Sequence, residues 1–210
     1  MSAHPRFLSI EGIDFCGKST QVARLMQRLA AAGRPVHLLR EPGGTAISER
    51  IRDLLLDNRH AEMDPRAEIL LFSAARAQLV AESILPLLDG GHLVLADRFF
   101  DSTTAYQGHG HRLDIDFVMR LNRFATRDLR PGRTLLLDIP VAESVRRRQA
   151  AGRGRDRMEQ GDADFFARIR EGYLAIAREE PDRVTVIDGA RDIDAVAADV
   201  WAAVCELWDL

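Results

Sequence analysis

The sequence predicts a three-layer α/β/α protein, in which a five-stranded parallel sheet lies between two layers of helices. Two observations support this prediction. Short apolar runs alternate with longer stretches of helical periodicity along the chain, and a glycine-rich segment directly follows the first apolar run. Strands that are separated by helical crossovers form parallel sheets covered on both faces. In such sheets, ligands bind beyond the carboxyl ends of the strands.

The N-terminal half holds three of the expected strands, and glycines separate the elements. The expected elements are, in order, strand Phe7–Ile10, helix Lys18–Ala32, strand Val36–Leu39, helix Ile47–Leu56, helix Arg66–Leu88 and strand Leu93–Ala96. The strands are apolar runs, and the helices carry apolar residues at helical spacing. Gly33 and Gly90-Gly91 are expected to end helices, because glycine commonly follows the last helical residue.

The C-terminal half continues the alternation. The expected elements are, in order, helix Ile115–Arg127, strand Thr134–Leu137, helix Val141–Ala150, helix Phe165–Glu179, strand Val184–Ile187 and helix Ile193–Trp208. Pro131-Gly132 and Pro181 are expected to form turns between them. With 210 residues, the chain is expected to be one domain covering residues 1–210.

Composition and charge disfavour several classes of function. A net charge of −3 gives no indication of a bulk nucleic-acid or membrane partner, and no apolar run approaches the length of about 18 residues needed to span a bilayer. The two cysteines, Cys16 and Cys205, are far apart and fit a reducing, cytoplasmic location. The start of the chain lacks a signal-peptide pattern. The histidines show no metal-ligand spacing and are interpreted as structural.

Residues 12–19 match the pattern G-x-x-x-x-G-K-[ST] of a phosphate-binding loop. Lys18 is the only lysine of the chain, and the other 28 of its 29 Lys and Arg residues are arginine. Loop glycines leave backbone N–H groups free for phosphate oxygens, and the lysine reaches the β- and γ-phosphates. The strand before the loop and the helix after it favour this interpretation over an accidental glycine-rich turn.

Polar residues follow the ends of the expected strands. Asp97-Arg98 closes the third strand, where an acid can hold Mg²⁺ directly or through water and Arg98 faces the substrate site. The ordinary alternative is a strand-end salt bridge. Residues 40–45 (Arg-Glu-Pro-Gly-Gly-Thr) form a turn after the second strand, and Arg52 in the next helix can turn back to bind a phosphate monoester. By itself this second pattern also fits a plain turn and a solvated helix face.

Two further segments suit a nucleobase. Phe72 and Arg76 lie four residues apart on one helix face, so that a ring can stack on a base while a guanidinium binds a base carbonyl. Residues 102–108 (Ser-Thr-Thr-Ala-Tyr-Gln-Gly) offer hydroxyl and amide groups to a base or sugar. Taken alone, these patterns equally describe a core Phe with a surface Arg, and a small polar loop.

The densest basic stretch runs from Arg146 to Arg157 and contains two glycines. We interpret residues of about 150–160 as a mobile, arginine-rich lid that closes over phosphates and supplies Arg153 and Arg155 to the transition state. Nucleic-acid binding is the alternative, and acidic neighbours such as Asp156 and Glu159 disfavour it.

Together these segments resemble the bacterial type of the thymidylate kinase family. The matching segments are Glu11-Gly12…Gly17-Lys18-Ser19-Thr20, Arg40-Glu41-Pro42-Gly43-Gly44-Thr45, Phe72-Ser73-Ala74-Ala75-Arg76, Asp97-Arg98…Ser102-Thr103…Ala105-Tyr106-Gln107-Gly108 and Asp156-Arg157-Met158-Glu159. They follow the family's order and cover nearly the whole chain. The resemblance implies a P-loop kinase fold, Mg²⁺-dependent transfer of the ATP γ-phosphoryl group to dTMP, and a homodimer formed through the long helix Arg66–Leu88.

The resemblance also implies a role for each site residue. The implied ATP-binding residues are Gly12, Ile13, Asp14, Phe15, Cys16, Gly17, Lys18, Ser19 and Thr20, and the implied metal residues are Ser19 and Asp97. The implied dTMP-binding residues are Asp14, Glu41, Arg52, Phe72, Arg76, Arg98, Thr103, Tyr106 and Gln107. The implied catalytic residues are Lys18, Arg98, Arg153 and Arg155. Among these, Phe72 stacks on thymine, Arg76 binds its O4 edge, Arg52 and Arg98 hold the dTMP phosphate, and Tyr106 disfavours ribonucleotides.

The chain departs from the family pattern at three positions. Phe15 stands where eukaryotic members carry an arginine, which fits the presence of lid arginines instead. Phe99 stands where Tyr or His is usual, and Cys16 replaces a small Ala.

Two other functions stay open: a P-loop kinase for another nucleotide or nucleoside, and a non-catalytic nucleotide-binding regulator on the same fold.

Overall fold

The five expected strands form one parallel sheet, as predicted, and the structure gives their order as β2-β3-β1-β4-β5. The computed structural model describes residues 2–152 and 156–210. The strands are β1 Ser2–Glu11, β2 Val36–Arg40, β3 Leu93–Asp97, β4 Leu129–Asp138 and β5 Val184–Asp188. Because β1 lies at the centre, the loop that follows it opens at the middle of the carboxyl edge.

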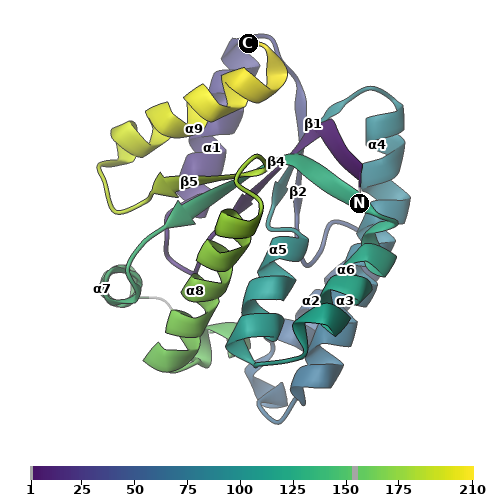
Figure 1. Ribbon diagram of the computed structural model, residues 1–210, viewed down its shortest axis with the longest axis vertical. Helices are drawn as coiled ribbons and strands as arrows, with labels where there is room; N and C mark the ends of the chain where they lie inside the picture. The colour runs from purple at the N-terminus through teal and green to yellow at the C-terminus, as the bar shows by residue number, and fades with distance from the viewer. Residues whose placement is uncertain (1, 153–155) are drawn as a thin grey trace.

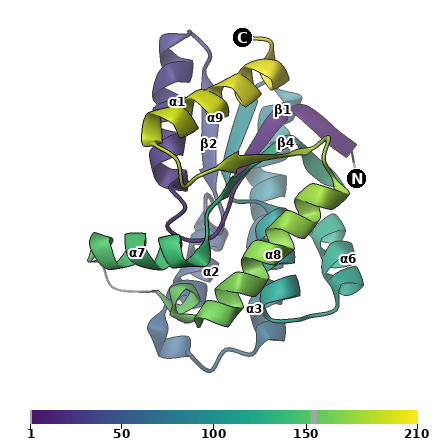
Figure 2. The same cartoon turned by 60° about the vertical axis from the view of Figure 1, so that its left-hand side comes forward.

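Helices cover both faces of this sheet (Figures 1 and 2). The α-helices are α1 Lys18–Ala31, α2 Ala46–Leu56, α3 Pro65–Leu79, α4 Leu85–Asp89, α5 Phe100–Thr103, α6 Ile115–Thr126, α7 Val141–Ala151, α8 Ala163–Glu179 and α9 Ile193–Trp208. Shorter 3₁₀ and π elements are η1 Asn58–His60, η2 Val80–Ile84, η3 Thr104–Gly110 and η4 Arg157–Gln160. Helices α1 and α9 lie on one face, and α3, α4, α5, α6 and α8 lie on the other.

The central strand β1 is buried on both faces. Its neighbouring residues Phe7 and Leu8 have no exposed surface, yet they belong to two different hydrophobic clusters. Successive side chains of a strand point to opposite faces, so each supports a separate helical layer. This pattern is typical of parallel sheets, whose strands read as continuous apolar runs.

Strands β1 and β4 extend well beyond their predicted bounds, and one expected turn is wrong. Pro131-Gly132 lies inside β4 instead of in a turn. Pro131 pairs with His4 of β1, and the register shifts between His4 and Leu8. Proline cannot donate to the ladder, so it marks an irregularity in the pairing.

The expected helix Arg66–Leu88 is continuous from Pro65 to Asp89, with the π-helical turn η2 inside it. Contrary to the expectation that no apolar run approaches the length of a membrane span, this helix is long and apolar enough to cross one: a stretch of 18 residues has a mean hydropathy of 1.3, and 39% of that stretch is buried inside the fold. Core helices of soluble proteins have similar length and composition, so these two properties alone are weak evidence for a membrane span. A second helical segment, α5 with η3 after β3, was not predicted, and it contains the small polar residues of the site.

A buried ion pair joins α5 to the start of β5. Arg183 NH1 lies 2.6 Å from Asp101 Oδ2, and both side chains are at most 4% exposed. The Thr134 hydroxyl of β4 bonds both partners, at 2.7 Å and 3.0 Å. Breaking such a pair by removing one partner typically costs 3–5 kcal/mol, because it leaves a buried charge uncompensated.

Candidate active site

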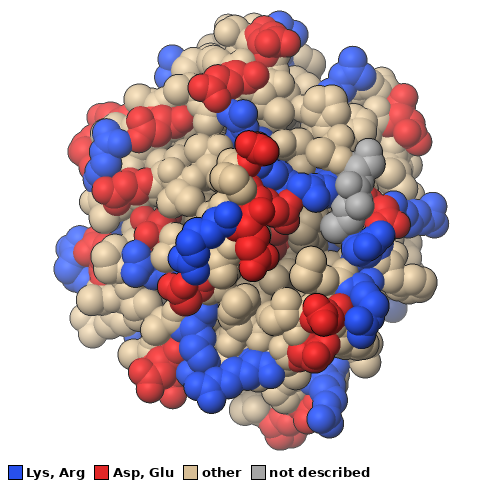
Figure 3. Space-filling model, in the orientation of Figure 1, with Lys and Arg blue, Asp and Glu red and all other residues tan. Residues whose placement is uncertain are grey.

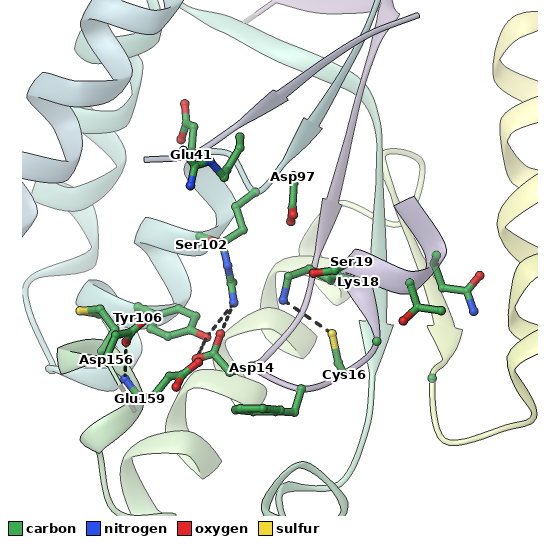
Figure 4. A pocket seen from close by; sticks show the side chains of 18 of the residues that line it. Asp14, Cys16, Lys18, Ser19, Glu41, Asp97, Ser102, Tyr106, Asp156 and Glu159 are labelled. Atoms are coloured by element: carbon green, nitrogen blue, oxygen red, sulfur yellow. Dashed lines mark hydrogen bonds and ion pairs between the residues drawn. The ribbon is translucent and has the colours of Figure 1, made fainter. Parts of the chain in front are cut away.

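A cavity of about 790 Å³ lies at the carboxyl ends of the strands (Figure 4). The predicted residues that line it are Asp14, Phe15, Cys16, Gly17, Lys18, Ser19, Thr20, Glu41, Arg52, Phe72, Asp97, Arg98, Thr103, Tyr106 and Gln107. They come from loops or helices after β1, β2 and β3, which is where parallel-sheet topology places ligands. Of the predicted site residues within the described ranges 2–152 and 156–210, Gly12, Ile13 and Arg76 do not line this cavity. Asp138 and Asp188, at the ends of β4 and β5, bond protein groups instead.

The phosphate-binding loop is shaped by glycine. Gly12 has φ of 141°, and a Cβ there would lie 2.5 Å from the Leu137 carbonyl oxygen. No other residue fits this position without strain. The Lys18 ammonium donates to the carbonyl oxygens of Gly12 (2.9 Å) and Ile13 (3.2 Å), and Lys18 is 8% exposed. The single lysine therefore already lies over its own loop, next to the cavity.

The N-terminus of α1 has no side-chain cap. Its N-cap residue Gly17 has φ of 101°, and no acidic residue lies in the first turn. The first backbone N–H groups of a helix have no partner within the helix, and with the helix dipole they favour an anion. This helix end, with Lys18 beside it, is suited to a phosphate group.

Helix α7 braces the loop. The Arg147 guanidinium donates to the carbonyl oxygens of Cys16 (3.3 Å) and Gly189 (2.9 Å). The Ser144 hydroxyl donates to the Asp14 carbonyl oxygen at 2.7 Å. Of the run of three arginines at 146–148, the structure thus places Arg147 at the loop and pairs Arg146 with Glu143.

Arg98 is the centre of a polar junction. It has φ of 72°, a left-handed conformation that arginine seldom adopts. Its guanidinium donates to Asp14 Oδ1 (2.6 Å), to the hydroxyls of Tyr106 and Tyr173 (3.1 Å each), and to the Gly12 carbonyl oxygen (3.0 Å). Figure 4 shows Asp14 and Tyr106 meeting there. The guanidinium is fixed by groups from three separate segments, so its position is set before any ligand binds.

The pKa values of two acids at this junction are shifted in opposite directions. Burial alone would raise the pKa of Asp14, but Arg98, Lys18 and the Tyr106 hydroxyl together hold that pKa below its usual range. In contrast, burial and the nearby Asp101 raise the pKa of the Glu11 carboxyl, which accepts hydrogen bonds from the Ser102 and Tyr173 hydroxyls at 2.6 Å and 2.9 Å. Asp14 is therefore the anion that faces Arg98 at neutral pH.

The other end of the cavity is suited to a flat, partly polar ring. Phe72 is half-buried, while Thr103 and Gln107 are 1% exposed and border the same space. Gln107 lies in the π-helical segment η3, a backbone form that is frequent at functional sites. Together these residues offer an aromatic face for stacking and polar atoms for one edge of a ring.

Arg76 lies behind this end and is 2% exposed. Its Nε donates to Glu41 Oε2 at 2.7 Å, and its NH1 to the Thr103 hydroxyl at 2.9 Å. Burial raises the pKa of Glu41 to about 7, although Arg76 opposes this shift. The structure thus brings Arg76 to the residues that border the ring site, and its contact with a base stays a prediction.

Ser19 and Asp97 supply the oxygen donors that suit Mg²⁺. Both line the cavity beside Lys18, and within residues 2–152 and 156–210 no hydrogen bond is recorded on the Asp97 carboxylate (Figure 4). Those same residues include no cluster of three His, Cys, Asp or Glu side chains that could hold a metal. Mg²⁺ commonly binds through one or two protein oxygens together with substrate phosphates. The donor set fits that arrangement.

The predicted catalytic residues Arg153 and Arg155 lie outside the described residues. On either side of them, α7 ends at Ala151, and Asp156 caps η4 by accepting a hydrogen bond from the Glu159 backbone N–H. Asp156, Met158 and Glu159 line the cavity. The predicted lid thus connects two segments that both reach the site.

Sequence reasoning did not assign four residues that this geometry involves. Arg147 belongs to the basic run at 146–148, and Glu11 directly follows the first expected strand. The sequence position of each residue therefore indicated that it could belong to the site. Tyr173 and Glu68 gave none: Tyr173 lies inside helix α8 far from any motif, and Glu68, although one turn before Phe72 in α3, is not part of the Phe72–Arg76 pattern.

Comparisons with known proteins agree with one another. A family model described as thymidylate kinase matches residues 10–200. A thymidylate kinase of Syntrophotalea carbinolica is 46% identical over 200 residues, or 93% of each chain. One of Deinococcus radiodurans is 46% identical over 201 residues, covering 95% of this chain and 96% of its own. The crystal structure of a thymidylate kinase from Ehrlichia chaffeensis matches with a TM-score of 0.77 and 33% identity, covering 94% of this chain and 97% of that one.

Proposed function

This chain belongs to the thymidylate kinase family and phosphorylates dTMP to dTDP with ATP as phosphate donor, and on that premise we propose how its residues divide the work. The observation that carries the proposal is the shared cavity. A phosphate-binding loop, a fixed arginine and an aromatic-walled ring site open into the same 790 Å³. A donor phosphate, an acceptor phosphate and a base can therefore be held within reach of one another.

The nucleophile is a phosphate oxygen of dTMP. A phosphate monoester is already largely anionic at pH 7, because its second pKa is about 6. Consequently the protein needs no strong general base, and catalysis consists of positioning and charge neutralisation. Lys18 and the amides of α1 hold the donor phosphates, and Arg98 with Arg52 holds the acceptor phosphate. Ser19 and Asp97 would hold Mg²⁺, which when bound neutralises charge on the phosphates.

The base and the sugar are recognised at the opposite end. Phe72 stacks on the thymine ring, and Thr103 and Gln107 face its polar edge. Arg76, which bonds Glu41 and Thr103, is proposed to bind the O4 edge of the base. Tyr106, held by Asp14 at 2.9 Å, crowds the sugar and disfavours a 2′-hydroxyl. Arg153 and Arg155 are proposed to close over the phosphates as lid residues.

A coupled ADP-release assay with ATP and Mg²⁺ tests this function. The acceptor panel is dTMP, dUMP, dCMP, dGMP, UMP and AMP, and we expect strong preference for dTMP. Preference for a different acceptor would keep phosphoryl transfer but contradict the base site. If protein that binds ATP turned over no acceptor, the chain would be a nucleotide-binding regulator.

We also propose a cytoplasmic homodimer that works on small molecules and binds neither nucleic acid nor membrane. Both cysteines are free thiols, which suits a reducing compartment. On the face in Figure 3, acidic and basic side chains are interspersed, unlike the single-sign surface of a nucleic-acid binder. Exposed apolar side chains gather instead on the neighbouring helices α2, α3 and α6: Ile47, Leu54, Leu70, Phe117 and Phe124.

Replacing Phe124 by aspartate is expected to convert the dimer into monomers. Phe124 is 82% exposed and lies two turns after Phe117 on the same side of α6, so a charge there would have to be desolvated at the interface. Light scattering coupled to gel filtration measures the mass. Leu38→Asp on the edge strand β2, where Leu38 is 44% exposed, is the matched control and should remain dimeric. A Phe124→Asp protein with the wild-type mass would contradict this interface.

A further inference from the structure

Glu68 lies between the base site and η4, the C-terminal part of the predicted lid. It lies in the first turn of α3 and is 1% exposed. Its Oε1 accepts hydrogen bonds from Gln107 Nε2 (2.7 Å) and lies 3.0 Å from His111 Nε2, and its Oε2 lies 2.7 Å from Arg157 NH2. Glu68 does not line the main cavity; it borders a separate pocket of about 280 Å³.

The carboxylate of Glu68 is ionised at neutral pH. Burial alone would raise its pKa, but the hydrogen bonds from His111 and Gln107 and the charge of Arg157 hold that pKa below the usual value. An ionised carboxylate accepts hydrogen bonds and cannot donate them. Only the NH₂ group of the Gln107 amide can therefore face Glu68, so the amide has one permitted orientation.

This orientation leaves the carbonyl oxygen of Gln107 for the cavity. Gln107 lines the main cavity with Phe72 and Thr103. In the described parts of the chain, no hydrogen bond is recorded to Gln107 Oε1. The polar atom left for a base is thus an acceptor.

Arg157 holds the carboxylate from its other side. It donates to the Leu55 carbonyl oxygen at 2.7 Å and is paired with Glu68, so α2, α3 and η4 meet at one guanidinium. With Gln107 and His111 on Oε1 and Arg157 on Oε2, both oxygens of Glu68 are fixed. The carboxylate therefore presents a fixed acceptor to the Gln107 amide.

We propose that Glu68 is a positioning residue that sets base specificity: it fixes the Gln107 amide so that its Oε1 accepts the N3–H of thymine. Uracil has the same N3–H, whereas cytosine presents an N3 lone pair, which would face the lone pairs of Oε1. Specificity then comes from a repulsive contact with the wrong base as well as from a hydrogen bond to the right one. This inference rests on the proposed function and names the residue behind its selectivity.

Glu68→Gln tests the proposal, because an amide at position 68 can donate as well as accept and so releases the Gln107 amide to rotate. The measurement is kcat/KM for dTMP, dUMP and dCMP. We expect the preference for dTMP over dCMP to fall about tenfold, the size of one hydrogen bond left unmade in a buried site. The preference for dTMP over dUMP should stay within about twofold, since both bases carry N3–H. General damage to the fold would lower all three rates without this pattern.

Asp101→Asn is the matched control. It also removes a carboxylate from a buried arginine pair, but that pair with Arg183 lies outside the cavity. It should lower stability and leave the dTMP to dCMP ratio unchanged. If this variant changed the ratio as much as Glu68→Gln does, the proposal would be overturned.

Gln107→Met keeps the proposal testable if Glu68→Gln fails to fold. Methionine has a similar length and no amide, so the same loss of preference over dCMP is expected. In the Gln107→Met background, adding Glu68→Gln should change the ratio no further, because the two residues act through one contact. An unchanged ratio in Gln107→Met, or in folded and active Glu68→Gln, overturns the proposal. Wild-type protein that does not use dTMP would instead contradict the proposed function.

Discussion

Lys18→Ala is expected to lower kcat on the order of 10³-fold while dTMP binding persists. Lys18 is the only lysine of the chain, and its ammonium lies 2.9 Å from the Gly12 carbonyl oxygen, over the loop that receives the donor phosphates. Alanine removes the positive charge that stabilises the phosphates while negative charge moves from one phosphate to another during the transfer. The acceptor groups, Phe72 and Arg98, lie on other elements and remain in place.

Steady-state ADP release and calorimetric titration with dTMP together measure this effect. Lys18→Arg is informative, because a guanidinium keeps the charge but is larger than the ammonium group. Lys18 is only 8% exposed, so the larger group should not fit beside the loop, and this variant should also be impaired. The control is Arg34→Ala, which removes a positive charge from the exposed turn beyond the far end of α1. Turnover of Lys18→Ala near the wild-type rate would exclude the phosphate-loop mechanism.

Arg98→Ala should produce the second large effect, a loss of about 10²- to 10³-fold in kcat/KM for dTMP together with lower stability. In the wild-type protein Arg98 bonds Asp14, Tyr106 and Tyr173 at once. Without it, the acceptor phosphate loses its fixed partner and the Asp14 carboxylate loses its counter-charge. Removal of one partner of a largely buried pair costs about 3 kcal/mol.

The stability loss should depend on pH in a defined direction. Arg98 helps to keep the pKa of Asp14 below its usual value in the folded wild-type protein, which stabilises the fold above the unfolded pKa of about 4. Without Arg98, burial raises that pKa, so the folded mutant gains stability when the carboxyl is protonated. Urea denaturation should therefore show a larger deficit against wild type at pH 7 than at pH 5.

Arg170→Ala provides the control for this experiment. It breaks a pair with Asp138, at 2.7 Å, that lies outside the cavity. It should cost some stability and leave the KM for dTMP unchanged. An Arg98→Ala protein whose KM, kcat and pH dependence matched those of Arg170→Ala would refute the role given to Arg98.

Much of the fold followed from local patterns. The five strands, the order of elements and the helix α9 with bounds Ile193–Trp208 were predicted, because apolar periodicity and glycine stops are read within a window of a few residues. The segment Phe100–Gly110 was not predicted as helical, since its π-helical part breaks the ordinary helical period. Pro131-Gly132 was taken as a turn, because only the pairing with β1 shows that β4 continues through it.

The chemistry of the site divides in the same way. The sequence by itself determined where phosphates would bind, since Gly12, Gly17 and Lys18 act through the backbone of one continuous loop. It also determined that polar residues after β2 and β3 would meet, because parallel strands share one carboxyl edge. Only the tertiary structure decided that Tyr173 would reach Arg98 from 75 residues away, and Glu68 would reach Gln107 from 39. Such contacts depend on how each helix is rotated and packed against the sheet, which no local pattern specifies.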